Sequence, residues 1–106
     1  MLKADIKIVF FATGIYKKGY DVDKVKSVTF MLASDEYYIG FIDNNDNSNG
    51  KYYVFGNEYK VIVTFPSLSE ENYKKYINIW KENNKVNICL GKKVIGEGRI
   101  LSYSLI

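Results

Sequence analysis

The chain of 106 residues contains no histidine, one cysteine (Cys89), one proline (Pro66) and one arginine (Arg99). Without histidine and with a single thiol, it can assemble neither a sulfur and imidazole zinc site nor an internal disulfide. Cys89 also lacks the histidine that usually activates a cysteine nucleophile, so we expect it to be a small strand residue in a reducing compartment. The missing residue types therefore argue against a metal centre, a disulfide scaffold and thiol catalysis.

Long apolar runs are also missing. None approaches the roughly 20 residues that span a bilayer, and the first residues lack the basic region and apolar stretch of a signal peptide. Lys, Asn, Ile and Tyr, whose codons are A/T-rich, dominate the chain, which is typical of an AT-rich bacterial genome. The sequence therefore predicts a bacterial cytoplasmic protein without membrane association.

The positive charge of the chain is mild. Its 15 basic and 12 acidic residues leave a net charge of +3, and the basic residues are scattered. Nucleic-acid-binding proteins usually gather Lys and Arg on one face, and Arg supplies most bidentate phosphate contacts. We therefore expect a protein partner. RNA is the alternative, because the ten tyrosines and six phenylalanines interleave with lysines and aromatic rings can stack on bases.

Alternating apolar residues predict strands at residues 5–12, 26–33, 37–43, 51–55, 59–65, 86–90 and 93–105. Pro66 should end the strand before it. In each of the adjacent pairs Tyr37–Tyr38 and Tyr52–Tyr53, one ring should face outward. The predicted inward-facing residues are Ile6, Ile8, Phe10, Val28, Phe30, Leu32, Tyr59, Val61, Val63, Phe65, Val86, Ile88 and Leu90.

One segment has helical periodicity, at about residues 68–83. Ser67 is its predicted N-cap, and Glu70 completes a capping box. Its apolar stripe, which should pack on the strands, comprises Tyr73, Tyr76, Ile77 and Trp80. Ile79 lies off this stripe, on a polar face where an apolar side chain has no core to enter. Ile79 therefore predicts that this face of the helix contacts a partner.

Gly96 and Gly98 lie two residues apart in the last predicted strand, so both leave the same face without a side chain. This spacing lets a strand bend sharply or lets a neighbouring backbone pass close by, as barrel corners require. The pattern predicts an all-β domain spanning residues 1–106, a small closed β-barrel of six or seven strands with one inserted α-helix.

The segment Gly91–Leu101 resembles the closing strand of the third domain of elongation factor Tu, where a G-G-R-T-V-G-x-G-x-V stretch ends a small β-barrel. Phe55–Thr64 is similar to the P-G-D-N turn and following strand of that family, and residues 3–18 to its opening strand. The resemblance implies a stand-alone relative of a translation-factor C-terminal barrel. It also places Lys93 where the family has an arginine in the closing turn.

The chain departs from that family in three places. It contains no G-x-x-x-x-G-K-[ST] sequence, so it should not bind GTP by itself. Tyr16–Asp21 and Val28–Leu32 replace the H-T-P-F and R-P-Q-F-Y-F-R segments, in a neighbourhood that helps the family hold aminoacyl-tRNA. The helical segment adds about ten residues where the family has a shorter connection. We expect this insertion to carry the contact with a partner.

No pattern of catalytic, metal-binding or nucleotide-binding residues is present, and no cofactor is expected. We therefore expect a non-enzymatic binding module that engages a protein or RNA partner. The alternative is a small immunity or antitoxin-type protein that neutralises a toxin, which an adjacent toxin gene would favour. The predicted partner-binding residues are Lys75, Tyr76, Ile79, Glu82, Lys92 and Lys93.

Overall fold

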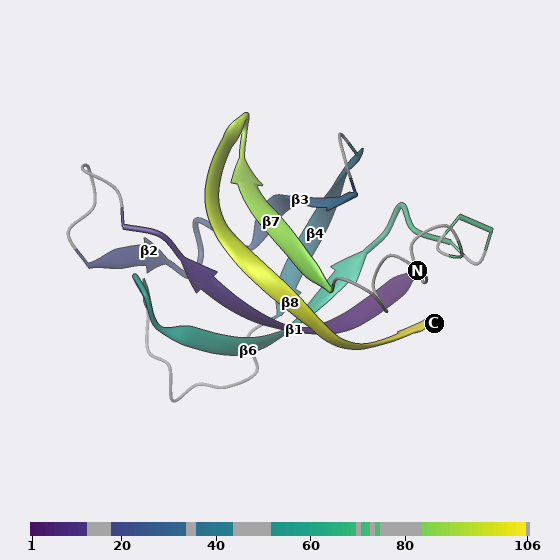
Figure 1. Ribbon diagram of the computed structural model, residues 1–106, viewed down its shortest axis with the longest axis horizontal. Helices are drawn as coiled ribbons and strands as arrows, with labels where there is room; N and C mark the ends of the chain where they lie inside the picture. Colours follow the sequence, from purple (N-terminus) through teal and green to yellow (C-terminus); the bar gives the residue numbers. More distant parts are fainter. Residues whose placement is uncertain are drawn as a thin grey trace.

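A computed structural model describes residues 1–12, 18–33, 36–43, 52–69, 71–72, 74 and 84–105 (Figure 1). These residues form eight β-strands, which confirms the predicted all-β class. The strands are β1 (Leu2–Phe10), β2 (Gly19–Asp21), β3 (Ser27–Ala33), β4 (Glu36–Asp43), β5 (Tyr52–Val54), β6 (Glu58–Phe65), β7 (Lys85–Leu90) and β8 (Lys93–Leu105).

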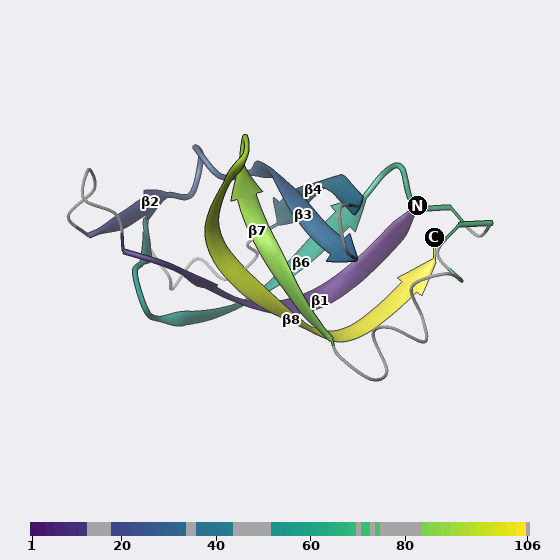
Figure 2. The ribbon, with the colours of Figure 1, turned by 45° about the horizontal axis from the view of Figure 1, so that its top comes forward.

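Six of the described strands close into an antiparallel barrel in the order β1, β6, β4, β3, β7, β8, and β8 pairs back with β1. The predicted closed barrel is therefore confirmed, with six strands. β2 and β5 form a separate two-stranded sheet at one end (Figure 1). In this closed order β3 lies across the barrel from β1, and β4 lies across from β8 (Figure 2). The barrel thus has two opposed walls.

The interior follows the predicted alternation. β1 buries Leu2, Ala4, Ile6, Ile8 and Phe10, and β6 buries Tyr59, Val61, Val63 and Phe65. Val28, Phe30 and Leu32 of β3 complete this core. Each large apolar side chain that is fully buried contributes roughly 1.5–3 kcal/mol, so this interior is the main stabilising element of the barrel. β6 ends at Phe65, directly before Pro66, as predicted.

Aromatic rings close the end of the barrel beside β2 and β5. The ring centroids of Phe10 and Tyr20 are 5.4 Å apart, those of Phe10 and Tyr53 are 5.3 Å apart, and those of Tyr53 and Tyr59 are 5.1 Å apart. The Tyr59 hydroxyl accepts a hydrogen bond from the Val54 N–H at 2.9 Å. Tyr53 is buried and Tyr52 is exposed, so this pair divides between the two faces as predicted.

β8 follows a long arc over the barrel (Figure 1). Its register against β7 shifts so that Ile95 has no partner, and its register against β1 shifts so that Leu101 has none. Each shift is a β-bulge, which bends a strand and increases its twist. The two bulges explain how one strand can pair with two neighbours around a tight barrel.

Gly96 and Gly98 lie between these bulges, and both are buried. A Cβ atom at Gly96 would lie 2.5 Å from the Val9 carbonyl oxygen, and one at Gly98 would lie 2.8 Å from a methyl group of Ile6. Real Cβ atoms do not approach other atoms so closely. The predicted close passage of a neighbouring strand at these two glycines is confirmed.

The prediction for the end of β7 is wrong. Leu90 was expected inside, but it is 47% exposed, whereas its neighbour Cys89 is buried. The extra residue at the bulge lies in β8, so β7 keeps its alternation and Cys89 shares a face with Thr29 and Val94. Leu90 lies on the other face, but β3 pairs with β7 only from Asn87 to Cys89, so Leu90 extends beyond the paired part of the barrel and stays exposed.

Most of the predicted helix at 68–83 lies outside the described residues, and its predicted N-cap at Ser67 is wrong. The Leu68 N–H donates to the Phe65 carbonyl at 3.2 Å, which closes a turn, and Leu68 is buried. The Asn72 side-chain oxygen accepts the Ser69 N–H at 2.6 Å, and the Asn72 side-chain nitrogen donates to the Ser67 carbonyl oxygen at 3.1 Å. Asn72 therefore holds the chain around Ser67 and Ser69. Within the described ranges, no helix has the length and apolar character needed to cross a bilayer.

Candidate binding surface

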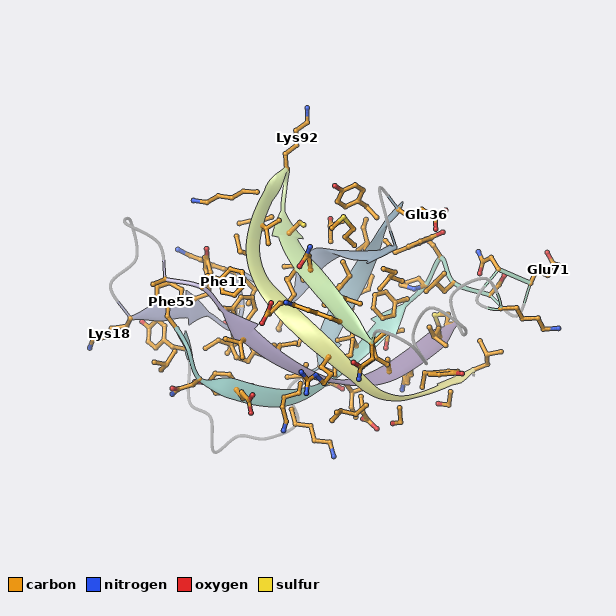
Figure 3. All side chains as sticks on the ribbon, in the orientation of Figure 1. Phe11, Lys18, Glu36, Phe55, Glu71 and Lys92 are labelled. Atoms are coloured by element: carbon orange, nitrogen blue, oxygen red, sulfur yellow. The ribbon has the colours of Figure 1, made fainter. Side chains whose placement is uncertain are left out.

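The structure describes two of the six predicted partner-binding residues. Lys92 and Lys93 are exposed at the tip of the hairpin between β7 and β8, where Gly91 adopts a φ of 63°. Figure 3 shows the Lys92 side chain pointing away from the barrel. The other four, from the predicted helix, are outside the described residues. They are Lys75, Tyr76, Ile79 and Glu82.

Four cationic side chains stand in one line across the outside of the barrel. Lys7 of β1 lies directly opposite Lys60 of β6 on one side and Arg99 of β8 on the other. Arg99 in turn lies opposite Lys85 of β7. Neighbouring strands are about 4.8 Å apart, so the line extends over roughly 15 Å. All four residues are exposed. We call Lys60, Lys7, Arg99 and Lys85 the cationic row.

A shallow hollow of about 200 Å³ opens beside the cationic row and spans from β6 to β7. Two glutamates at its edge pair with lysines of the row. The Lys7 Nζ lies 3.6 Å from a Glu58 carboxylate oxygen, and the Lys85 Nζ lies 2.9 Å from one of Glu97. No ion pair of Arg99 occurs with any described residue. The hollow is lined by Lys7, Val9, Glu58, Lys85, Glu97, Gly98, Arg99 and Leu101.

A second hollow of about 200 Å³ continues along β1, beyond the other side of the row. Asp5 lines it, and the Ser102 hydroxyl donates a hydrogen bond to Asp5 Oδ2 at 2.7 Å. Carboxylates therefore border the cationic row on both sides. Each of these three carboxylates, on Asp5, Glu58 and Glu97, already has a lysine or serine neighbour.

The cationic row has a cost for folding. Like charges that face each other directly across an antiparallel pair are destabilising, and the row contains three such pairs. The two glutamate ion pairs offset only part of this cost, because exposed ion pairs contribute at most about 1 kcal/mol each. Acidic residues at alternate positions would stabilise the barrel better. The row is therefore more easily explained by binding than by folding.

Cys89, by contrast, has the environment of a structural residue. It is 2% exposed, and burial raises the pKa of the Cys89 thiol. A raised pKa disfavours the thiolate, which is the reactive form of cysteine. In the part of the chain that the structure describes, no three Cys, Asp or Glu side chains are placed to hold a metal ion.

Sequence reasoning missed the cationic row because its members are far apart in the chain. Lys7, Lys60, Lys85 and Arg99 belong to four strands, and only the register of the closed barrel aligns them. The alternation in the sequence shows that each of them is an outward-facing strand residue. It does not show that β1 pairs with both β6 and β8.

Comparison with protein-family models, with curated proteins and with solved structures found no match to this chain. The resemblance to the third domain of elongation factor Tu therefore remains a prediction from its sequence motifs.

Proposed function

We propose that this chain is a non-enzymatic binding domain that engages an acidic protein partner through the cationic row. The observation that carries the proposal is the register itself, which sets four exposed cations directly opposite one another on four neighbouring strands. An anionic partner would form attractive contacts with each of these cations and so offset the repulsion between them. Surfaces with complementary charge also speed the encounter of two proteins and fix their relative orientation.

Arg99 is the centre of the proposed contact. It lies between Lys7 and Lys85 in the row and also lines the hollow. Its planar guanidinium group can donate two parallel hydrogen bonds to one carboxylate, which a lysine cannot do. The flanking lysines would contribute less directional attraction. An aspartate or glutamate of the partner, seated in the hollow, fits this arrangement.

The carboxylates beside the row favour a protein over a nucleic acid. Phosphates repeat evenly along a nucleic acid strand, so several of them would approach Asp5, Glu58 or Glu97. A protein surface can instead place its acids over the row and its basic or polar groups over those carboxylates. The modest net charge of +3 and the single arginine agree with this choice.

Both functions that the sequence indicates are compatible with such a partner: a stand-alone translation-factor domain that engages protein or RNA, and a protein that neutralises a toxin. The proposed surface lies on the barrel wall, whereas the predicted one lay mainly on the helical segment. An acidic toxin and an acidic translation component would use the row in the same way. Identification of the partner would separate the two functions.

The proposal can be tested with a fluorescent glutamate-rich peptide as the probe, at about 50 mM salt, where exposed charges are only weakly screened. Arg99→Glu should weaken peptide binding about tenfold or more, which corresponds to roughly 1.4 kcal/mol. Lys26→Glu is the matched control, because Lys26 is an exposed cation outside the row that pairs with Asp23 at 3.4 Å. Its effect on the dissociation constant should be much smaller.

Two outcomes would contradict the proposal. Equal loss of binding in Arg99→Glu and Lys26→Glu would show that only net charge matters. Tighter binding of a single-stranded oligonucleotide with the same number of charges, again lost in Arg99→Glu, would assign the row to nucleic acid instead. Lys92→Glu tests the predicted hairpin contact in the same assay.

A further inference from the structure

The outward residues of β8 change character in regular steps along the hollow that contains Arg99. Glu97, Arg99 and Leu101 occupy alternate positions of this strand, and all three line the hollow. Glu97 is half-buried, Arg99 is exposed, and Leu101 is 46% exposed. A carboxylate, a guanidinium group and an aliphatic side chain therefore follow one another at steps of about 6.8 Å.

Leu101 is uncovered on the side of β1 because of the second bulge of β8. Ile100 pairs with one residue of β1 and Ser102 pairs with the next, so Leu101 between them is the extra residue. No β1 side chain lies opposite it. Bulges often occur beside functional sites, where they change the direction of a side chain. Leu101 thus presents an apolar surface directly beyond Arg99.

The neighbouring strands reinforce the two charged positions. Val9 of β1 is half-buried in the hollow and lies opposite both Glu97 of β8 and Glu58 of β6. Two carboxylates therefore flank Val9. Arg99 is flanked in the same way by the two lysines that lie opposite it in the cationic row. The hollow thus has an acidic end at Val9 and a basic centre at Arg99.

The ion pairs within the hollow leave its acidic end accessible. Glu58, which pairs with Lys7, has a side chain that is 64% exposed, and Glu97, which pairs with Lys85, has one that is 38% exposed. A carboxylate has two oxygens with about four acceptor sites, so it can accept from a second cation while it keeps the first. Exposed ion pairs are also weak, so a partner can rearrange them.

The complement of this pattern is a basic, an acidic and an aliphatic side chain in that order. A lysine or arginine over Val9 would reach both glutamates and lay its aliphatic stem on the valine. A carboxylate would take two parallel hydrogen bonds from Arg99. An aliphatic side chain against Leu101 would exclude water from the neighbouring charged contact, as the apolar parts of an interface do.

The spacing favours an extended partner segment over a helix. Alternate residues of a strand share one face, so three of them extend over roughly 14 Å. Three residues placed one helical turn apart extend over only about 11 Å. The three positions on β8 have the spacing of a strand. One extended segment can therefore meet all of them.

We propose that the hollow recognises an extended segment of the partner protein in which a basic, an acidic and an aliphatic residue occupy alternate positions. The inference rests on the proposed function, because it places the acidic residue of the partner on Arg99. It adds that Glu58 and Glu97 select the basic residue and that Leu101 selects the aliphatic one. A peptide that contains only glutamate would satisfy the central position alone.

The first test compares two fluorescent peptides of identical composition at about 50 mM salt, where exposed charges are weakly screened. The patterned peptide has Lys, Glu and Leu at three alternate positions with serine between them. The shuffled peptide has Leu in the centre and Glu at one end. The parent protein should bind the patterned peptide about fivefold more tightly, as expected for one added exposed ion pair. Fluorescence anisotropy measures both dissociation constants.

Charge reversal tests the acidic end. Glu97→Lys should remove the preference for Lys over Glu at the first position of the patterned peptide. Asp23→Lys is the matched control, because it makes the same change in net charge at an exposed aspartate that pairs with Lys26 and does not line the hollow. This variant should keep the preference of the parent protein.

The apolar position provides a test that does not depend on charge. Leu101→Ser should reduce the preference for Leu over Ser at the third position of the peptide about threefold, since less apolar surface is buried. Val94→Ser is its control, because Val94 is also exposed on β8 but does not line the hollow. A circular dichroism melt of each variant shows whether its fold is intact.

Equal binding of the patterned and shuffled peptides by the parent protein would overturn the inference. A preference that survives both Glu97→Lys and Leu101→Ser would overturn it as well, because the selection would lie elsewhere. In either case, binding of the glutamate-rich peptide that Arg99→Glu weakens would still support the proposed function. Loss of that dependence on Arg99 would overturn both.

Discussion

The two walls of this barrel share one interior and differ in what they present to solvent. The wall of β6, β1, β8 and β7 carries the cationic row, whereas the outer face of β4 exposes Tyr37, Ile39 and Phe41, followed by Asp43. Their inner faces are equally apolar, because burial in a common core allows nothing else. The side chains on their outer faces do not contribute to that core, so they are free to differ. The difference teaches that the outward-facing residues of the strands, which the core does not constrain, determine what a small barrel can bind.

Both walls depart from the outer surface that folding would favour. Opposed cations and half-exposed aromatic rings each make a lone barrel less stable or less soluble. The two departures also respond to different conditions, since salt screens charge but strengthens apolar association. This contrast allows each wall to be tested without disturbing the other.

The largest effect is expected where the shared interior is broken. Gly96→Val should lower the free energy of unfolding by about 2–3 kcal/mol, because the new side chain meets the Val9 carbonyl oxygen and the backbone of β1 must move. Gly98→Val should cost about 1–2 kcal/mol, since the atoms nearest to a Cβ there are side-chain methyl groups that can shift. Urea unfolding measures both values.

Gly91→Asn serves as the control for these two variants. Gly91 has a φ of 63° and no atom within 4 Å of an added Cβ, and asparagine tolerates this left-handed conformation. Its effect should stay within about 0.5 kcal/mol. If Gly96→Val were as mild as Gly91→Asn, the close passage of β1 under β8 would not limit stability.

Salt should act next on the wall that carries the cationic row. Between about 50 mM and 500 mM salt, binding of the glutamate-rich peptide should weaken about tenfold, because the exposed cations of the row become screened. Fluorescence anisotropy measures this dissociation constant. A dissociation constant that does not change with salt would show that the cations of the row do not make the contact.

Alkaline pH should weaken the barrel through Cys89, which lies in the cross-strand line from Ile39 to Val94. Burial raises its pKa in the folded chain, so the unfolded chain loses the proton first. The stability contributed by the neutral thiol is therefore complete below about pH 8.5, the ordinary value of the unfolded thiol. It is lost as pH rises through the folded pKa, by at most about 1.4 kcal/mol per pH unit.

Urea unfolding of the parent and of Cys89→Ala across this alkaline range measures the effect. The alanine variant should lose stability less steeply, since lysine and tyrosine titrations are common to both proteins. Identical slopes would show that the thiol titrates alike in the folded and unfolded chains. Slow reaction of the native thiol with an alkylating reagent is the matching kinetic result, because the thiolate is the reacting form.

The smallest effect concerns the repulsion within the cationic row. Arg99→Gln removes the cation that faces both Lys7 and Lys85, so it should stabilise the isolated domain by a few tenths of a kcal/mol. The gain should vanish at about 1 M salt, where screening acts within roughly 3 Å. A loss of more than about 1 kcal/mol would instead show that Arg99 packs as a structural residue.

The inner faces of the strands were predictable because local alternation and global burial agree along most of the chain. Ile6, Ile8 and Phe10, for example, repeat every second residue and all enter the core. The prediction was wrong at Leu90, which follows the last β7 residue that pairs with β3 and is therefore exposed. How far two strands pair depends on how the whole barrel closes, so the sequence of β7 contains no sign of it.

By itself the sequence determined the all-β class, the inward residues and the close approach at Gly96 and Gly98, since these depend on two-residue periodicity and missing side chains. Only the tertiary structure decided which outward residues meet. Lys60, Lys7, Arg99 and Lys85 come into one line on four adjacent strands through strand order and register. The physical reason is that pairing between distant strands depends on closure of the whole barrel, which no local pattern encodes.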